Sequence, residues 1–277
     1  MPAVPTVNIV TALCGEAAPI RDALGLRRVS TEPFEVYEGA GLRLVISGVG
    51  TLLSAAAVGY VGGRDGASGC DIWINCGIAG HRTLALGTPI LADQVTSATA
   101  GRSYYPTILF DAPCRTGTVS THDYPVTAYP SDACCDMEAA GFVTAAAALT
   151  HGELVHVLKI VSDNAASSLH MINRERVRAL IRGGVTCLTA LVERVRTVAA
   201  LLPPALDQRC PARILQRWRF THAQSEQLRR LHQRYEALTS GAGRFGSDLN
   251  DCRSASEVLG HLEAVVDSLP LRVLARE

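Results

Sequence analysis

The feature that most constrains this chain is a repeated order of apolar runs, glycine turns and small-residue segments between residues 7 and 201. Residues 7–13 (VNIVTAL) and 42–47 (LRLVIS) are short, apolar and rich in β-branched side chains, which is typical of buried strands. Gly48-Val49-Gly50 follows the second run, and the alanine-rich stretch SAAAVGYV at 54–61 comes next. A strand, a glycine turn and a small-residue helix in this order indicate an α/β fold.

The same alternation continues along the chain. It predicts further strands at 34–37, 71–75, 89–95, 117–121 and 154–161, and helices at about 17–24, 136–149 and 174–201. The strand at 71–75 is expected to end in a turn at Gly77–Gly80, and the last helix has a weak point at Gly183-Gly184.

The composition changes at Leu202-Pro203-Pro204, and two helical segments follow. Each begins with a capping box, Thr221 to Gln224 and Ser254 to Glu257. We therefore expect a catalytic domain at 1–201 and a helical C-terminal extension at 202–277, dispensable for chemistry but needed for solubility or assembly. The extension carries two apolar stripes at helical spacing, expected to pack on the main domain or on a partner: Leu228, Leu231, Tyr235 and Leu238, then Leu259, Leu262, Val266 and Leu269.

Cysteine and charge patterns exclude several classes of protein. The nine cysteines are scattered without a CxxC pair and the eight histidines form no cluster, so we expect reduced thiols and no metal site. Lys+Arg and Asp+Glu both number 26, which gives no long-range attraction to nucleic acid. No basic leader and no apolar run long enough to span a membrane is present, so we expect a cytoplasmic protein without membrane association.

In an α/β sheet, ligands bind at the carboxyl ends of the strands. Glu16, the loop Gly48–Gly50, the loop Asn75–Gly80 and Ser162-Asp163 all fall at such ends, and Met137-Glu138 opens a helix. These positions alone predict an α/β enzyme with two or three carboxylates near its site.

Four segments, in this order, resemble motifs of the nucleoside phosphorylase/nucleosidase family, most closely the 5'-methylthioadenosine/S-adenosylhomocysteine nucleosidases and futalosine hydrolases. They are ISGVG at 46–50 with Ala55-Ala56 (family "TGIG…AA"), NCGIAG at 75–80 ("NTGxAGG"), DMEAA at 136–140 ("xMEAA") and IVSDNA at 160–165 ("ISDxA"). The resemblance covers about residues 7–200. It implies a three-layer α/β/α phosphorylase/hydrolase-like fold around a mixed central sheet, and cleavage of the bond between a purine and ribose.

The resemblance also implies roles for single residues. Asp163, within the pair Ser162-Asp163, acts as the general acid on purine N7; the plain alternative is a helix N-cap. Glu138 accepts hydrogen bonds from the ribose hydroxyls, or simply favours a helix N-terminus. Met137 packs on the ribose or belongs to the core. Glu16 positions the attacking water, or is a solvated surface side chain.

The glycine loops and one tyrosine complete the set of candidate substrate-binding residues. Gly48, Gly50 and Gly77 either cradle a phosphate through backbone N–H groups or let the sugar approach the backbone. Tyr124 lies near the position at which relatives stack an aromatic ring on the purine, and is otherwise an ordinary half-buried tyrosine.

Two departures from the family bear on the nucleophile. Phosphorylases usually have arginine at the position of Asn75 and serine at that of Ile78, and both bind phosphate. Because a phosphate dianion needs cationic partners, water is the favoured nucleophile. A phosphorylase would have to recruit arginine from elsewhere, such as Arg43, Arg82 or a neighbouring subunit.

Three functional hypotheses follow. The first is a hydrolase of adenosine-type nucleosides that needs no cofactor. The second is a purine nucleoside phosphorylase that uses phosphate as co-substrate. The third is an accessory protein that binds a nucleoside or a partner through the helical extension. The family's usual assembly leads us to expect a homo-oligomer.

Overall fold

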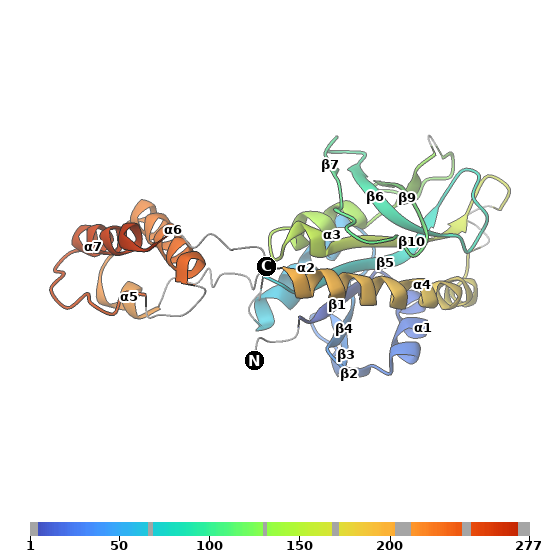
Figure 1. Ribbon diagram of the computed structural model, residues 1–277. Coiled ribbons are helices and arrows are strands. Elements are labelled where there is room, and N and C mark those ends of the chain that lie inside the picture. The colour runs from blue at the N-terminus through green and yellow to red at the C-terminus, as the bar shows by residue number, and fades with distance from the viewer. Residues whose placement is uncertain are drawn as a thin grey trace. The chain divides into compact units, whose positions relative to one another are not determined.

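The computed structural model describes residues 5–65, 69–129, 132–167, 172–202, 212–239 and 245–270 (Figure 1). The chain divides into two compact units, Met1–Leu202 and Pro203–Glu277. Each unit has its own buried apolar residues and is described separately below.

A mixed sheet forms the centre of the first unit. Its strands are β1 (Val7–Thr11), β2 (Arg27–Ser30), β3 (Glu35–Gly39), β4 (Leu42–Ile46), β5 (Ile72–Gly80), β6 (Pro89–Ser97), β7 (Ser103–Tyr104), β8 (Arg115–Thr121), β9 (Cys134–Asp136) and β10 (Val155–Asp163). The order is β10-β6-β8-β9-β5-β1-β4-β3-β2, with β7 beside β6. Because β10 also pairs with β5, the strands from β5 to β10 along this path close into a ring. The central pairs β1–β4, β1–β5 and β5–β10 are parallel, which brings their carboxyl ends to one edge.

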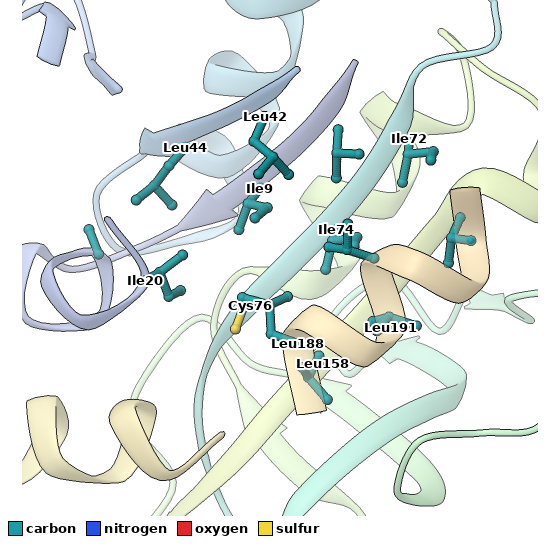
Figure 2. Packing of buried hydrophobic residues seen from close by; sticks show 14 of the residues in the cluster. Ile9, Ile20, Leu42, Leu44, Ile72, Ile74, Cys76, Leu158, Leu188 and Leu191 are labelled. Atoms are coloured by element: carbon teal, nitrogen blue, oxygen red, sulfur yellow. The ribbon is translucent and has the colours of Figure 1, made fainter. Parts of the chain in front are cut away.

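Two pairs of helices cover the sheet. On one face, α1 (Cys14–Leu24) and α4 (Arg174–Leu201) bury an aliphatic cluster against β1, β4, β5 and β10; Figure 2 shows part of it, with Ile20 of α1 and Leu188 of α4 facing Ile74. On the other face, α2 (Thr51–Asp65) and α3 (Ala139–Ala146) pack around Trp73 and Phe142. The arrangement has three layers, α/β/α, with a mixed sheet, as the sequence predicted.

Two local predictions near the site were wrong. Gly77–Gly80 is not a turn, because β5 continues to Gly80 and pairs with β10 up to that point. Helix α1 begins at Cys14, so Glu16 lies inside its first turn instead of before the helix. In both places, the ends of the elements follow from hydrogen bonds with distant segments that periodicity does not report.

Other element boundaries also differ from the prediction. Helix α3 is shorter than the predicted 136–149. Helix α4 passes through Gly183-Gly184 without a break. A Cβ at Gly184 would lie 2.5 Å from Ile160 Cδ1, so this glycine is needed for close packing of the helix on β10. The short strands β2, β7 and β9 were not predicted, since two to four residues are too few to show a period.

The second unit contains α5 (Ala212–Arg217), α6 (His222–Thr239) and α7 (Ala255–Ser268). The first predicted capping box forms, since Thr221 and Gln224 exchange side chain–backbone hydrogen bonds. The second forms in part: Ser254 Oγ accepts from the Glu257 N–H, but the Glu257 carboxylate accepts from the N–H of Arg253 instead of Ser254. The apolar stripes of α6 and α7 pack on each other and on Ile214, Phe245 and Leu249. This corrects the expectation that they need the main domain or a partner for burial.

Within the described ranges, none of the helices combines the length and apolar character that a membrane crossing requires.

Candidate active site

A cavity of about 170 Å³ lies where β1, β5, β9 and β10 end. Seven of the residues predicted for the site line it: Glu16, Ile78, Tyr124, Met137, Glu138, Ser162 and Asp163. The other four, Gly48, Gly50, Asn75 and Gly77, do not line it. The three glycines are adjacent in the sequence, in contact or hydrogen-bonded to residues that do. The sheet therefore brings together carboxylates that are up to 147 positions apart in the chain, from 16 to 163.

Glu16 is held by three backbone N–H groups. Its Oε2 accepts from Ala12 and Leu13 at 2.9 Å each, and its Oε1 accepts from Ile78 at 2.8 Å. The side chain folds back over the first turn of α1 and is only 2% exposed. Burial raises the pKa of Glu16, although the Ile78 N–H and the charge of Lys159 oppose the rise. A glutamate with a fixed orientation and a raised pKa suits proton transfer near neutral pH.

Gly77 explains how that carboxylate fits against the sheet. A Cβ at Gly77 would lie 2.8 Å from Glu16 Oε1, so a side chain there would displace the carboxylate. Gly77 therefore makes room for Glu16 and does not contact the cavity itself. The predicted approach of sugar or phosphate at this glycine is replaced by the approach of a glutamate.

Glu138 joins the first glycine loop to the cavity. The N–H of Gly50 donates to Glu138 Oε1 at 2.9 Å. Gly48 and Gly50 have φ values of 85° and 108°, a conformation that favours glycine, and so let the chain turn toward α2. Burial raises the pKa of Glu138, while the charge of Lys159 opposes the rise.

Lys159 is a site residue that the sequence reasoning missed. Its Nζ lies 2.7 Å from Asp136 Oδ2, and both side chains are buried. Burial by itself would lower the pKa of Lys159, but the charges of Asp136, Glu138 and Glu16 outweigh it and raise that pKa. A signal was available, because Lys159 is the single lysine of the sequence and interrupts the apolar run 154–161.

Asp136 connects that ion pair to the backbone at Glu138 and Ala139 through hydrogen bonds. Its carboxylate accepts from the Thr121 hydroxyl at 2.7 Å and from the N–H groups of Ala139 at 2.8 Å and Glu138 at 3.3 Å. Thus the start of α3 is built on a buried charge pair, and the position of Glu138 depends on it.

Asp163 ends β10 and receives two hydroxyl donors. Ser162 Oγ donates to Oδ1 at 2.5 Å, and the Tyr129 hydroxyl donates to Oδ2. A Cβ at Gly80 would lie 2.6 Å from both Asp163 Oδ2 and the Tyr129 ring, so the pair meets over a position where only glycine fits. Burial, together with the hydrogen bond to Asp163, raises the pKa of Tyr129. Tyr129 is the second contact that the sequence did not reveal.

Asn75 was predicted to bind substrate, but it does not line the cavity. It sits in the middle of β5, buried, and its side-chain amide donates to the Val10 carbonyl at 3.1 Å. It therefore stabilises the β1–β5 pair inside the sheet. Its Oδ1 has no hydrogen-bond partner among the described residues.

Cationic side chains do not reach the cavity in the described part of the chain. Arg43, a candidate phosphate ligand, binds Glu38 and Asn8 along the sheet instead. Arg82, the other candidate, pairs with Asp132 at 2.9 Å on the surface. Nor do three or more His, Cys, Asp or Glu side chains gather in a geometry suited to a metal ion within those same ranges.

Neither a family model nor a curated protein matches this sequence. The structure, in contrast, is similar to solved nucleosidases. A Helicobacter pylori nucleosidase with 5'-methylthioadenosine in its active site has a TM-score of 0.58 and 14% identity, over 68% of this chain and 98% of that chain. Futalosine hydrolase of the same organism has a TM-score of 0.58 and 15% identity, over 69% and 98%.

A 5'-methylthioadenosine/S-adenosylhomocysteine nucleosidase from Streptococcus pneumoniae, solved with a transition-state inhibitor, gives a TM-score of 0.55 and 20% identity, over 70% of this chain and 99% of that chain. At these identities the similarity establishes the fold. The α/β architecture predicted from the four motifs is thereby confirmed as the nucleosidase architecture.

Proposed function

We propose that this protein hydrolyses the N-glycosidic bond of an adenosine-type purine nucleoside. The observation that carries the proposal is the meeting of the buried side chains of Glu16, Glu138 and Asp163 in one cavity, each with different hydrogen-bond partners. Three carboxylates with separate surroundings can act as base, ribose ligand and acid on a single substrate. The nucleosidase fold, and the substrate and inhibitor bound by its relatives, support the same conclusion.

In this proposal the three carboxylates act on successive parts of the substrate. The bond between ribose C1' and the purine breaks, its electron pair moves to the base, and Asp163 donates a proton at N7. Glu138 binds the ribose hydroxyls and stabilises the positive charge that develops on the sugar. Glu16 takes a proton from the water that attacks C1'. Met137 packs on the ribose.

Water is proposed as the nucleophile because the residues described as lining the cavity include no cationic side chain. Lys159, whose charge acts on Glu16 and Glu138, is already paired with Asp136. A phosphate dianion would face Glu16, Glu138 and Asp163 without an arginine partner, which is unfavourable. No organic cofactor is needed for this reaction.

A nucleoside panel tests the reaction. Adenosine, inosine, 5'-methylthioadenosine and 5'-deoxyadenosine are incubated with the full chain in phosphate-free buffer and again with phosphate, and the products are separated by chromatography. Free base and free sugar without phosphate are expected. A sugar 1-phosphate formed only with phosphate would establish the phosphorylase alternative. Binding of adenine without any turnover would favour the accessory-protein hypothesis.

We also propose that the protein is a homo-oligomer. Large apolar side chains are exposed beside the cavity: Leu52 is 85% exposed and Tyr124 80%, with Val49 and Leu53 next to them. Val49 and Tyr124 line the cavity itself, so a second copy packed here would complete the site. Light scattering should give a mass above that of one chain, and Leu52→Asp should lower it; a monomer in both would contradict the proposal.

The proposed location is the cytoplasm. Cys14, Cys76, Cys114, Cys134, Cys135, Cys187 and Cys252 are free thiols, which suits a reducing compartment.

A further inference from the structure

Residues 124–129 form a segment over the cavity that is anchored at one end. Tyr124, Pro125 and Val126 line the cavity, and residues 124–128 are exposed or half-exposed. Tyr129 is buried, with 9% exposure. Within the described ranges, the Tyr129 hydroxyl makes the single side-chain hydrogen bond of this segment, and it goes to Asp163.

Asp163 is therefore occupied before any substrate arrives. Its Oδ1 accepts from Ser162 and its Oδ2 accepts from Tyr129. Both oxygens of the Asp163 carboxyl group therefore face a hydroxyl donor. Because Gly80 has no side chain, the Asp163 carboxyl group and the Tyr129 ring can lie against the sheet at this position.

Adenine requires the opposite arrangement. Its N7 is an acceptor, so Asp163 has to present a proton there, and its exocyclic amino group needs a free acceptor beside that proton. The oxygen that carries this proton becomes a poor acceptor, so the hydroxyl that donates to it has to turn away or leave. The bond from Ser162 moves with the carboxyl because the two residues are neighbours in β10, whereas Tyr129 comes from a separate, exposed segment.

The volume of the cavity supports the same conclusion. At about 170 Å³ it is smaller than the roughly 300–1,000 Å³ that small-molecule sites usually provide. Because Tyr124, Pro125 and Val126 form part of its wall, withdrawal of their segment would enlarge it.

We propose that Tyr129 is a gating residue that competes with the purine base for Asp163, so that its hydroxyl leaves and segment 124–129 withdraws before the base binds. The inference rests on the proposed function, since it takes a purine as the occupant. It assigns Tyr129 a role in setting the affinity for the base.

The test compares Tyr129→Phe with Tyr104→Phe by calorimetric titration with free adenine. Both substitutions remove one tyrosine hydroxyl bond, but the Tyr104 hydroxyl donates to the Gly152 carbonyl, outside the candidate site. In Tyr129→Phe, adenine no longer has to displace the Tyr129 hydroxyl from Asp163. The free energy of a hydrogen bond to a charged group then no longer opposes binding, which corresponds to about tenfold tighter binding or more. We expect this gain in Tyr129→Phe and none in Tyr104→Phe.

Unchanged or weaker adenine binding by Tyr129→Phe refutes the gate, even if the unaltered protein cleaves nucleosides. Tighter adenine binding without turnover of any nucleoside leaves the gate standing and refutes the proposed hydrolysis. A second measurement uses the unaltered chain, in case the variant does not fold. Amide hydrogen exchange of residues 124–129, followed by mass spectrometry, should become faster with saturating adenine; slower or unchanged exchange refutes withdrawal of the segment.

Discussion

The substitution Lys159→Met tests whether the buried ion pair holds the site together. Lys159 Nζ and Asp136 Oδ2 are 2.7 Å apart, and both side chains are inaccessible to water. Methionine preserves most of the aliphatic volume and removes the charge. Asp136 then keeps its hydrogen bonds from Thr121, Glu138 and Ala139 but loses its cation.

The expected loss of stability follows from the burial of the pair. Removing one partner of a buried ion pair leaves an uncompensated charge, which costs about 3–5 kcal/mol. For a unit of this size, each kcal/mol corresponds to roughly 2–4 °C, so the melting temperature should fall by about 6–20 °C. The double variant Lys159→Met/Asp136→Asn removes both charges of the pair, so Asp136 no longer carries an unpaired charge, and it should recover about 2 kcal/mol of the loss.

Urea unfolding can isolate the first unit. The sequence has two tryptophans, Trp73 buried in β5 and Trp218 in the second unit. In a Trp218→Phe background, the fluorescence of Trp73 therefore reports the first unit alone. A loss below about 1 kcal/mol for Lys159→Met, or a double variant less stable than the single one, would refute the reasoning about the pair.

The same substitution should also move the pH dependence of activity. The charge of Lys159 lowers the pKa of both Glu16 and Glu138 against the larger effect of burial. Without it, both pKa values rise further. If the reaction needs these carboxylates ionised, then as the pH is lowered the variant should lose activity at a higher pH than the unaltered protein does.

Four further outcomes are expected. Asp163→Asn should lower kcat by roughly 10²–10⁴-fold while the melting temperature shows an intact fold; normal turnover would remove it as the acid. Glu138→Gln should lower kcat/KM with a nucleoside but leave binding of free adenine unchanged in calorimetry, because its contacts are to ribose. Burial raises the pKa of Glu16, so the acid limb of kcat/KM should lie above pH 4.5, the ordinary glutamate value, and Glu16→Gln should leave only the limb set by Glu138; a limb at or below 4.5 would contradict its role as base. Leu262→Ala should destabilise the second unit by about 2–5 kcal/mol without changing kcat; a parallel loss of activity would tie that unit to the site.

Local patterns were sufficient for the elements with a clear period. Apolar spacing and cap residues were enough to predict the strands at 42–46 and 155–163, the long helix from Arg174, and Thr221 and Ser254 as helix caps of the second unit. Short strands such as β7 and β9 were not, because they exist only through pairing with neighbours.

Glycine is the residue type for which the structural role differs most from the role that the sequence indicated. In the sequence, Gly77, Gly80 and Gly184 indicate turns or weak points. In the structure they lie inside regular elements, at places where a methyl group would strike Glu16, Asp163 or Ile160. Periodicity describes one element at a time, and the need for close approach arises only between elements.

The sequence by itself determined the alternation of strands and helices. It also predicted Glu138 and Asp163 as site residues through motifs that keep their order along the chain, and Glu16 through its place after the first strand. Only the tertiary structure decided which polar groups meet. Lys159 reads as an interruption of an apolar strand and Tyr129 as an ordinary loop tyrosine, until the closing of β10 against β5 and the course of segment 124–129 bring them to Asp136 and Asp163. The physical reason is that a strand pattern specifies which face is buried, whereas the partner of a buried charge is set by residues dozens of positions away.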